Sequence, residues 1–295
     1  MPHSELYDQI NRLPCWQGRI EIAPLVGGMT NRNFVVTDSQ AGRFVVRVGR
    51  DLPEHGVMRF NELAAARAAY AAGISPEVIF ATEGMLVCRH IESHTLTPDD
   101  VREPRYFASI IDLIRRCHYE VPSHFRGPAL AFWVFHIIRN YLSLLETESG
   151  SSLSAELPRL RAMTERLESA VGPITLVFGH NDLLAANFLD DGKRLWLIDW
   201  DYAGFNSPLF DLANLSSNNG FDETLEAQLL HDYFGATVDA ACQRAFAAMK
   251  CASLLRETLW GGVSEFRSSI QFDYAGYTRD YLHRLDHAWE QFRHG

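Results

Sequence analysis

The order of hydrophobic and polar residues changes near residue 92, and the change predicts two structural parts. Before it, β-branched or alternating apolar runs are separated by Gly and polar turns, which is typical of an antiparallel sheet. These runs span residues 19–28, 32–38, 42–49, 77–82 and 84–91. A short helix is expected near residues 4–12. The Ala-rich stretch 59–73 has apolar residues at helical spacing and ends at Gly73, so it predicts the one main helix of this part.

From Thr97 onward the pattern is mainly helical. Thr97 suits the N-cap, Pro98 the first helical position, and the two acids that follow suit the first turn, where the helix dipole favours them. Helical spacing continues over residues 98–118, 129–147, 153–170, 223–233, 238–267 and 276–293. Short strands are expected at 174–179, 187–191 and 194–200, the last two joined by a turn at Asp191 and Gly192.

The two patterns together predict an α+β fold of two lobes. Residues 1–93 are expected to form a small N-terminal lobe, an antiparallel sheet with one main helix. Residues 94–295 are expected to form a larger, mostly helical C-terminal lobe, with the boundary near residues 92–97. A chain of 295 residues, 47% of them hydrophobic, is long enough to bury a substantial core in this arrangement.

Three polar residues in the stretch "HNDLLAANFLDDGKRLWLIDW" carry a chemical signal. Asp182 and Asn187 lie five residues apart just after a predicted strand, and Asp199 ends the hairpin that follows. This is the spacing of the phosphotransferase loop H-x-D-x-x-x-x-N and its second metal-binding aspartate. Magnesium requires hard oxygen ligands, and a separate carboxylate must face the attacking hydroxyl. We therefore predict Asn187 and Asp199 as metal ligands and Asp182 as the catalytic base.

Acids at strand ends have a simpler explanation as turn residues, because Asp and Asn favour turns. We accept it for Asp190 and Asp191. For the other three residues it would make the His-x-Asp pair, the five-residue gap and the strand context coincidences. His180 has two open roles, as a catalytic base or as a brace that holds the loop through a backbone hydrogen bond; the brace is favoured.

A phosphate-binding loop is expected in the first lobe. Gly27 and Gly28 lie between two predicted strands, where glycines let backbone N–H groups approach phosphate. Thr30 and Asn31 would add side-chain donors. An ordinary hairpin turn gives the same glycine pattern. The interpretation as a phosphate-binding loop therefore depends on the presence of the catalytic-loop motif in the second lobe.

A cation is then expected on the third strand. Arg47 occupies that position, since the only lysines, Lys193 and Lys250, lie in the second lobe. A charge in a buried strand is costly unless paired, and Glu62 in the next helix is the natural partner. Arginine binds phosphate oxygens through two N–H groups, so it suits the role. The alternative is an edge-strand arginine that points to solvent.

Composition and charge limit the partners. The formal net charge of −10 disfavours nucleic acid and suits a small cationic substrate. No window of about twenty residues is free of charge, and no basic stretch leads into an apolar run at the start, so we expect no membrane partner and a cytoplasmic protein. The five cysteines are scattered, which predicts free thiols. The oligomeric state is not predicted.

Several motifs in order carry a resemblance to a known family. They are "GGMTNRNF", "VVRVG", "NELAAARAAYAAGISPEV", "HNDLLAANF", "LIDWDYAG", "FDLAN" and "ETLWGGVSEFRSSIQFDYAGY". This order resembles the choline/ethanolamine kinases, within the aminoglycoside phosphotransferase-like branch of the protein-kinase-like superfamily. The resemblance covers most of the chain and is least clear over residues 125–170. It implies a bilobal protein-kinase-like fold and phosphorylation of a small-molecule alcohol with ATP and Mg²⁺.

The resemblance also implies roles for individual residues. The catalytic base falls on Asp182, and the other motif residues keep the roles given above. Asp211 in "FDLAN" matches an aspartate that supports the catalytic loop by accepting hydrogen bonds. The segment "LVCRHIE" matches the hinge, where backbone groups from Arg89 to Ile91 would pair with adenine.

The expected substrate pocket is one that binds a cationic ligand. A quaternary ammonium has no N–H donor and is held by aromatic faces and carboxylates. Trp260 matches a pocket tryptophan of choline kinases, and Tyr202 lies beside the catalytic hairpin. Asp201, directly after Trp200, could line either the metal site or the cation pocket; these three are the predicted substrate residues. Glu257 stands where eukaryotic members carry another cage tryptophan, and Asn218 stands near where they place an acid.

We therefore predict a small-molecule kinase that phosphorylates an amino alcohol, with choline or ethanolamine first. Thiamine, an aminoglycoside or another alcohol remains open as the substrate, because the motifs serve these equally. A catalytically silent kinase-like protein that binds a nucleotide or a partner is the alternative of another class.

Overall fold

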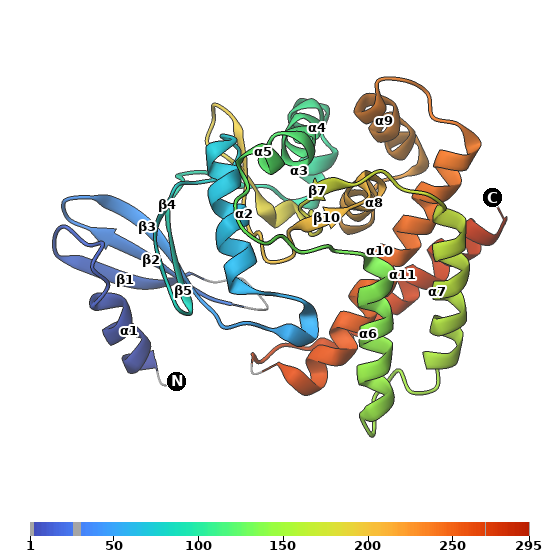
Figure 1. The fold of residues 1–295 in the computed structure, drawn as a ribbon, viewed down its shortest axis with the longest axis horizontal. Helices are drawn as coiled ribbons and strands as arrows, with labels where there is room; N and C mark the ends of the chain where they lie inside the picture. Colours follow the sequence, from blue (N-terminus) through green and yellow to red (C-terminus); the bar gives the residue numbers. More distant parts are fainter. Residues whose placement is uncertain (1–2, 26–30, 269, 295) are drawn as a thin grey trace.

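The chain folds into two lobes in a computed structural model that describes residues 3–25, 31–268 and 270–294 (Figure 1). The N-terminal lobe is a five-stranded antiparallel sheet in the order β1-β2-β3-β5-β4. Its strands are β1 (Ile20–Leu25), β2 (Arg32–Asp38), β3 (Gly42–Val48), β4 (Val78–Thr82) and β5 (Met85–Arg89), and its helices are α1 (His3–Asn11), the 3₁₀ turn η1 (Pro53–His55) and α2 (Arg59–Ala71). The predicted α+β fold class is thereby confirmed.

The two helices of this lobe join different cores. Alternate residues of β2 and β3, among them Phe34 and Val46, are buried with Leu6 and Ile10 of α1 in one small cluster. This is the period of two that a sheet with one covered face produces. The alanines of α2 are instead buried in the large cluster of the C-terminal lobe. The main helix is therefore the element that joins the sheet to the second lobe. The division at residue 93 stays a prediction.

The C-terminal lobe is built mainly of helices. They are α3 (Pro98–Arg102), α4 (Pro104–Tyr119), α5 (Val121–His124), α6 (Val134–Thr147), α7 (Leu157–Val171), α8 (Pro208–Asn219), α9 (Glu223–Phe234), α10 (Ala240–Arg267) and α11 (Tyr274–His294). Short strands form two small sheets, β10-β7 and β6-β8-β9, with bounds β6 (His94–Thr95), β7 (Val177–Gly179), β8 (Phe188–Asp190), β9 (Leu195–Leu197) and β10 (Gly204–Asn206). A 3₁₀ turn, η2 (Ala185–Asn187), precedes β8.

Two differences from the sequence prediction have local causes. The helix expected at 98–118 is two helices, because Pro104 has no N–H to donate and Glu103 before it is extended, with φ −73° and ψ 136°. Helix α8 was missed. Nearly all its residues are buried, so it shows no polar face and no amphipathic period. The available signal was Ser207, whose side chain accepts a hydrogen bond from the Leu209 N–H, followed by Pro208 at the first helical position.

Helix α10 runs through the centre of the C-terminal lobe and is buried around its whole circumference over its second half. In Figure 1 it lies against α11, α6 and α8. At Gly261 a Cβ atom would lie 2.5 Å from Thr278 Oγ1 and 3.0 Å from Tyr277 Cδ1, so glycine permits the close approach of α11. This packing places Arg256 of α10 beside Asp182 of the catalytic loop, as described below.

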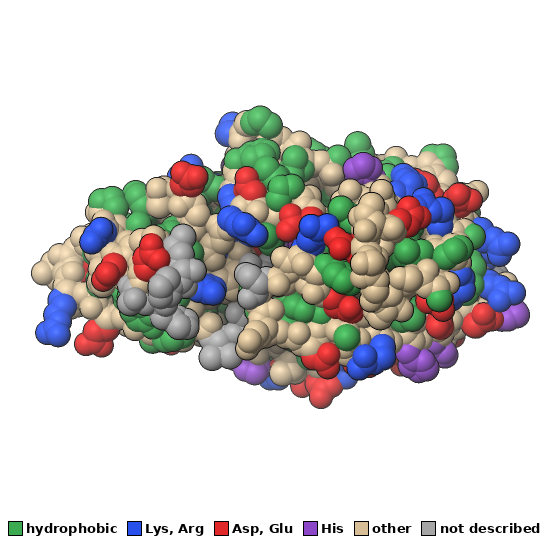
Figure 2. Space-filling view, turned by 90° about the horizontal axis from the view of Figure 1, so that it is seen from below, with side chains coloured by type: hydrophobic (Ala, Val, Ile, Leu, Met, Phe, Trp, Pro, Cys, Tyr) green, Lys and Arg blue, Asp and Glu red, His purple; other side chains and the backbone are tan. Residues whose placement is uncertain are grey.

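The surface is mixed in charge on the face that Figure 2 shows, where acidic and basic side chains are intermingled. Among the described helices, none combines the length and the apolar character that a membrane crossing requires.

Replacing Gly261 with alanine is expected to lower the free energy of unfolding by about 1–3 kcal/mol, because the β-branched Thr278 cannot move aside easily. Gly262→Ala is the matched control on the same helix. Its Cβ would lie 2.9 Å from Leu153 Cδ1, the end of a flexible side chain, so the gain in helix propensity of about 1 kcal/mol should offset the contact. Urea denaturation of both variants measures the difference; equal stabilities would contradict this account.

Candidate active site

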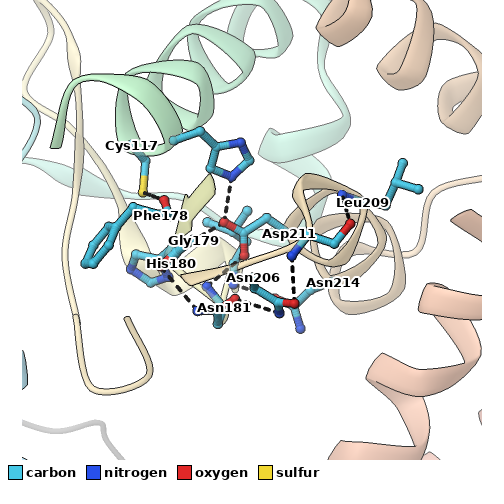
Figure 3. Close-up of polar contacts among 12 residues, drawn as sticks. Cys117, Phe178, Gly179, His180, Asn181, Asn206, Leu209, Asp211 and Asn214 are labelled. Atoms are coloured by element: carbon cyan, nitrogen blue, oxygen red, sulfur yellow. Dashed lines mark hydrogen bonds and ion pairs between the residues drawn. The ribbon is translucent and has the colours of Figure 1, made fainter. Parts of the chain in front are cut away.

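The catalytic loop between β7 and β8 is held in place by hydrogen bonds to one carboxylate of α8. Asp211 Oδ2 accepts a hydrogen bond from the His180 N–H at 2.8 Å, and Oδ1 accepts one from the Asn181 N–H at 2.7 Å (Figure 3). Asn214, one turn further along α8, accepts from the Leu183 N–H at 2.6 Å. Asp211 therefore lies in the position that its predicted supporting role requires.

A further partner of the Asp211 carboxylate, a histidine side chain, was not predicted from the sequence. His118, at the end of α4, is fully buried and its Nε2 lies 2.9 Å from Asp211 Oδ2, while Nδ1 lies 2.7 Å from the Tyr233 hydroxyl. Burial raises the pKa of Asp211, but the hydrogen bond and charge of His118 and the donated N–H of His180 outweigh it, so the pKa lies below its ordinary value. Asp211 thus stays ionised as a fixed acceptor for the loop.

His180 has the geometry of a brace. Its ring is fully buried, and Nε2 lies 2.9 Å from the Ile198 carbonyl oxygen, which fixes that nitrogen as the N–H donor. Burial lowers its pKa, which favours the neutral ring. The ring also packs on Trp200, with centroids 4.8 Å apart. His180 thereby ties the catalytic loop to the hairpin that carries Asp199, and this position supports the bracing role over the catalytic one.

The three predicted catalytic and metal residues lie together. Asn187 Nδ2 donates to the Asp182 carbonyl oxygen at 2.9 Å, and the N–H of Ile198, next to Asp199, donates to the Asn187 carbonyl oxygen at 3.0 Å. Asp199 has φ +69°, a left-handed backbone that is uncommon outside glycine and is often found at functional sites. Loop and hairpin thus bring the three side chains to one place.

Electrostatics at this place favour a bound cation. Burial raises the pKa of Asp182 well above its ordinary value, and Asp199 adds to that shift. The Asp199 side chain is open to solvent, yet protein atoms surround its other sides, and this burial together with the charge of Asp201 raises its pKa to about 7. A divalent ion would relieve this mutual repulsion.

The donor set fits magnesium with a partly open coordination sphere. The amide nitrogen of Asn187 is engaged by Asp182, which leaves its Oδ1 and the Asp199 carboxylate as hard oxygen donors. Within the described part of the chain, no group of three or more His, Cys, Asp or Glu side chains forms a closed metal site. Water and phosphate oxygens would complete the coordination, which is the arrangement that magnesium prefers.

The expected ion pair between Arg47 of β3 and Glu62 of α2 is present. Arg59, which the sequence analysis missed, joins it: Nη1 donates to Glu62 Oε2 at 2.7 Å and to Asp201 Oδ1 at 2.6 Å. Its signal was its place one turn before Glu62 on the same helix. Two arginines and two acids from both lobes therefore form one network, and Arg47 does not point to solvent.

Two predicted ligand-binding residues are engaged in this network instead. Asn31 Nδ2 donates to Asp201 Oδ2 at 2.9 Å, and Asn31 Oδ1 accepts from Arg59 Nη2 at 2.8 Å. Asp201 is 3% exposed. Both Asp201 oxygens are thus engaged, by Arg59 and Asn31, and a role for Asp201 in the substrate pocket stays a prediction. Of the predicted phosphate loop, Gly27, Gly28 and Thr30 lie outside the described residues, and they stay predictions.

The hinge also differs from the prediction in part. The Arg89 N–H donates to the Glu77 carbonyl oxygen at 2.8 Å, and its Nη1 donates to the Ala41 carbonyl oxygen at 2.9 Å. Both groups are used within the sheet, so the Arg89 N–H is not available to adenine. Ile91 is half-buried, and adenine binding by its backbone stays a prediction.

The predicted aromatic pocket contains a protein cation. Arg256 of α10 lies with its guanidinium carbon 4.2 Å from the ring centroid of Tyr202, and its Nη1 lies 3.8 Å from Asp182 Oδ1. One face of Tyr202, a predicted substrate residue, is thus covered by Arg256. The Tyr202 hydroxyl accepts a hydrogen bond from Trp260 Nε1 at 3.0 Å. Trp260 also lines a cavity of about 320 Å³ between the sheet lobe and the end of α10, and Asp182 does not line that cavity.

Comparison with known proteins assigns the chain. A family model described as choline/ethanolamine kinase matches residues 22–231. The chain belongs to the choline/ethanolamine kinase family. The protein LicA of Haemophilus influenzae is 30% identical over 276 residues, which cover 90% of this chain and 78% of that protein. Human ethanolamine kinase 2 is 26% identical over 294 residues, covering 90% of this chain and 75% of that protein.

Solved structures agree. A choline/ethanolamine kinase family protein from Mesorhizobium loti superimposes with a TM-score of 0.78 at 29% identity, over 98% of this chain and 95% of that one. An aminoglycoside 2'-phosphotransferase solved with GDP shares the fold, with a TM-score of 0.68 at 14% identity over 97% and 98%. The predicted family and the prediction of a small-molecule kinase are therefore confirmed.

His118→Ala is expected to lower the free energy of unfolding by about 2–4 kcal/mol, because it leaves the buried Asp211 carboxylate without one partner. Tyr233→Phe leaves the His118–Asp211 contact in place and removes the hydrogen bonds of the Tyr233 hydroxyl to His118 and Tyr119, which should cost about 1 kcal/mol. Urea denaturation distinguishes the two. If His118→Ala were no less stable than Tyr233→Phe, the loop support would not depend on this histidine.

Proposed function

We propose that this family member transfers the γ-phosphoryl group of ATP to the hydroxyl of a small amino alcohol, with choline and ethanolamine as the first candidates, in the cytoplasm. The observation that carries the proposal is the convergence of Asp182, Asn187 and Asp199 on a loop that Asp211 holds in place. The description of the matched family, choline/ethanolamine kinase, and the name of the human relative, ethanolamine kinase 2, support the choice of alcohol.

The acceptor hydroxyl would lie against Asp182, which orients it and takes its proton late in the transfer. The transition state for phosphoryl transfer is loose, so orientation and charge neutralisation matter more than the basicity of the carboxylate. The hydrogen bonds from Asn187 to Asp182 and from His180 to Ile198 fix the position of this group before the substrate arrives.

Charge neutralisation on the nucleotide side would come from both lobes. Arg47 would bind phosphate oxygens, held in orientation by Glu62, and the loop that contains Gly27, Gly28 and Thr30 would add backbone donors. Asn187 and Asp199 would hold Mg²⁺, which supplies further neutralisation of the phosphates when it is bound. The Arg59–Asp201 pair would keep the two lobes in register around these groups.

The test of substrate class is ATP consumption, with and without Mg²⁺, against choline, ethanolamine, thiamine, kanamycin and homoserine. We expect magnesium-dependent turnover with choline or ethanolamine and little with the other alcohols. Turnover of thiamine or kanamycin alone would move the substrate elsewhere in the superfamily. No turnover with any alcohol, together with retained ATP binding, would indicate a silent kinase-like protein.

Asp182→Asn is expected to lower kcat by about 10²–10⁴-fold while the fold and ATP affinity are kept, because the amide cannot accept the proton. Asp191→Asn is the matched control, since Asp191 only accepts hydrogen bonds from the turn after β8 and from Trp196. Steady-state kinetics and nucleotide titration measure both variants. Phosphoryl transfer at the wild-type rate in Asp182→Asn would remove this residue from its assigned role.

A further inference from the structure

Arg256 is the largest fully buried side chain among the described residues, with 2% exposure. It comes from the middle of α10 and reaches the region between the catalytic loop and the aromatic residues of the acceptor side. Its guanidinium contacts the faces of Tyr202, at 4.2 Å, and Phe132, at 5.8 Å, and lies 3.8 Å from Asp182 Oδ1. A permanent positive charge therefore lies beside the Asp182 carboxyl group.

Neighbouring residues hold Arg256 in this place. Its Nη1 is paired with Glu257 Oε1, and Glu257 Oε2 accepts a hydrogen bond from the Tyr277 hydroxyl of α11 at 2.7 Å. Tyr277 in turn packs edge-on against Trp260, with centroids 5.5 Å apart. The residue that stands in place of an expected cage tryptophan, Glu257, is thus the anchor of the buried arginine.

The arrangement is a costly way to fill a core. The Nε and Nη2 atoms of Arg256 are buried and make no hydrogen bond with any described residue. Unpaired buried donors lower stability, and a buried ion pair is often no more stable than apolar residues of the same size. Packing alone therefore gives no reason for an arginine at this position, which points to a role in what the pocket accepts.

The two candidate amino alcohols differ in what they need from a pocket. A quaternary ammonium is bulky, has no N–H group and depends on open aromatic faces. The face of Tyr202, which would serve it, is covered by Arg256. A primary ammonium is smaller and donates hydrogen bonds, which the carboxyl oxygens of Asp182, 3.8 Å from Arg256, can accept.

We propose that Arg256, anchored by Glu257, is a specificity-determining residue that occupies the cation–π position on Tyr202 and so favours alcohols with a primary ammonium over those with a quaternary ammonium. This inference rests on the proposed function, because it places the acceptor alcohol beside Asp182. The selectivity between the two alcohols would come from the buried charge of Arg256, whereas the catalytic loop would serve either alcohol.

The first measurement is the ratio of kcat/KM for ethanolamine to that for choline in the wild-type protein, which should exceed about tenfold. In Arg256→Ala the ratio should fall by about tenfold or more, because the space and the charge are vacated and the quaternary ammonium can stack on Tyr202. Arg256→Lys keeps the charge and should keep most of the wild-type ratio. Arg256→Met, similar in length and uncharged, should shift the ratio in the same direction as alanine and serves if alanine prevents folding.

Arg244→Ala is the matched control. Arg244 lies on the same helix and stacks over Phe292 at 4.1 Å, at the opposite end from the catalytic loop, so its loss should leave the ratio unchanged. A wild-type preference for choline, or turnover of both alcohols with an unchanged ratio in the folded Arg256 variants, overturns the specificity proposal alone. Wild-type turnover of neither alcohol overturns the proposed function and this inference with it.

Discussion

The hydrogen bonds between Asp211 and the backbone of the catalytic loop are the constraint on which the site depends. A single buried carboxylate fixes two successive N–H groups, of His180 and Asn181, and its own ionisation is maintained by His118. Asn181 can then keep its left-handed backbone, and the loop turns so that Asp182 and Asn187 face the hairpin that ends at Asp199. The three predicted site residues are thus held in place by the protein's own contacts.

A second set of buried charges joins the lobes around this loop. Arg59 bridges Glu62 of its own helix and Asp201 of the catalytic hairpin. Asn31, just before β2, donates a hydrogen bond to the same Asp201 carboxylate. Buried ion pairs contribute little net stability because of their desolvation cost, but they specify which groups must meet. The network therefore acts mainly on register, since it sets where β3, which carries Arg47, lies relative to the hairpin that carries Asp199.

Much of the site was predictable because its signals are local. The gap between Asp182 and Asn187 and the cation on the third strand are encoded in spacing, and the pairing of Arg47 with Glu62 follows from the cost of an unpaired buried charge. Asp201 and Tyr202 were assigned to the substrate because they lie beside the hairpin. Neither assignment could include the side chains that cover them, Arg59 and Arg256, because those come from other elements.

The alternation of the sheet strands, the α2 helix and the family could be predicted from the sequence, since each depends on residues close together in the chain or on motifs in order; the chemistry of the catalytic loop stays a prediction. The partners across elements, His118 beside Asp211, Arg59 between the lobes and Arg256 against Tyr202, became visible only in the folded chain, because each pair joins residues far apart in the sequence. For Asp211 and Arg256 a further cause is that their helices, α8 and α10, are buried on most sides. A helix without a polar face shows no period that would indicate which of its residues meets which neighbour.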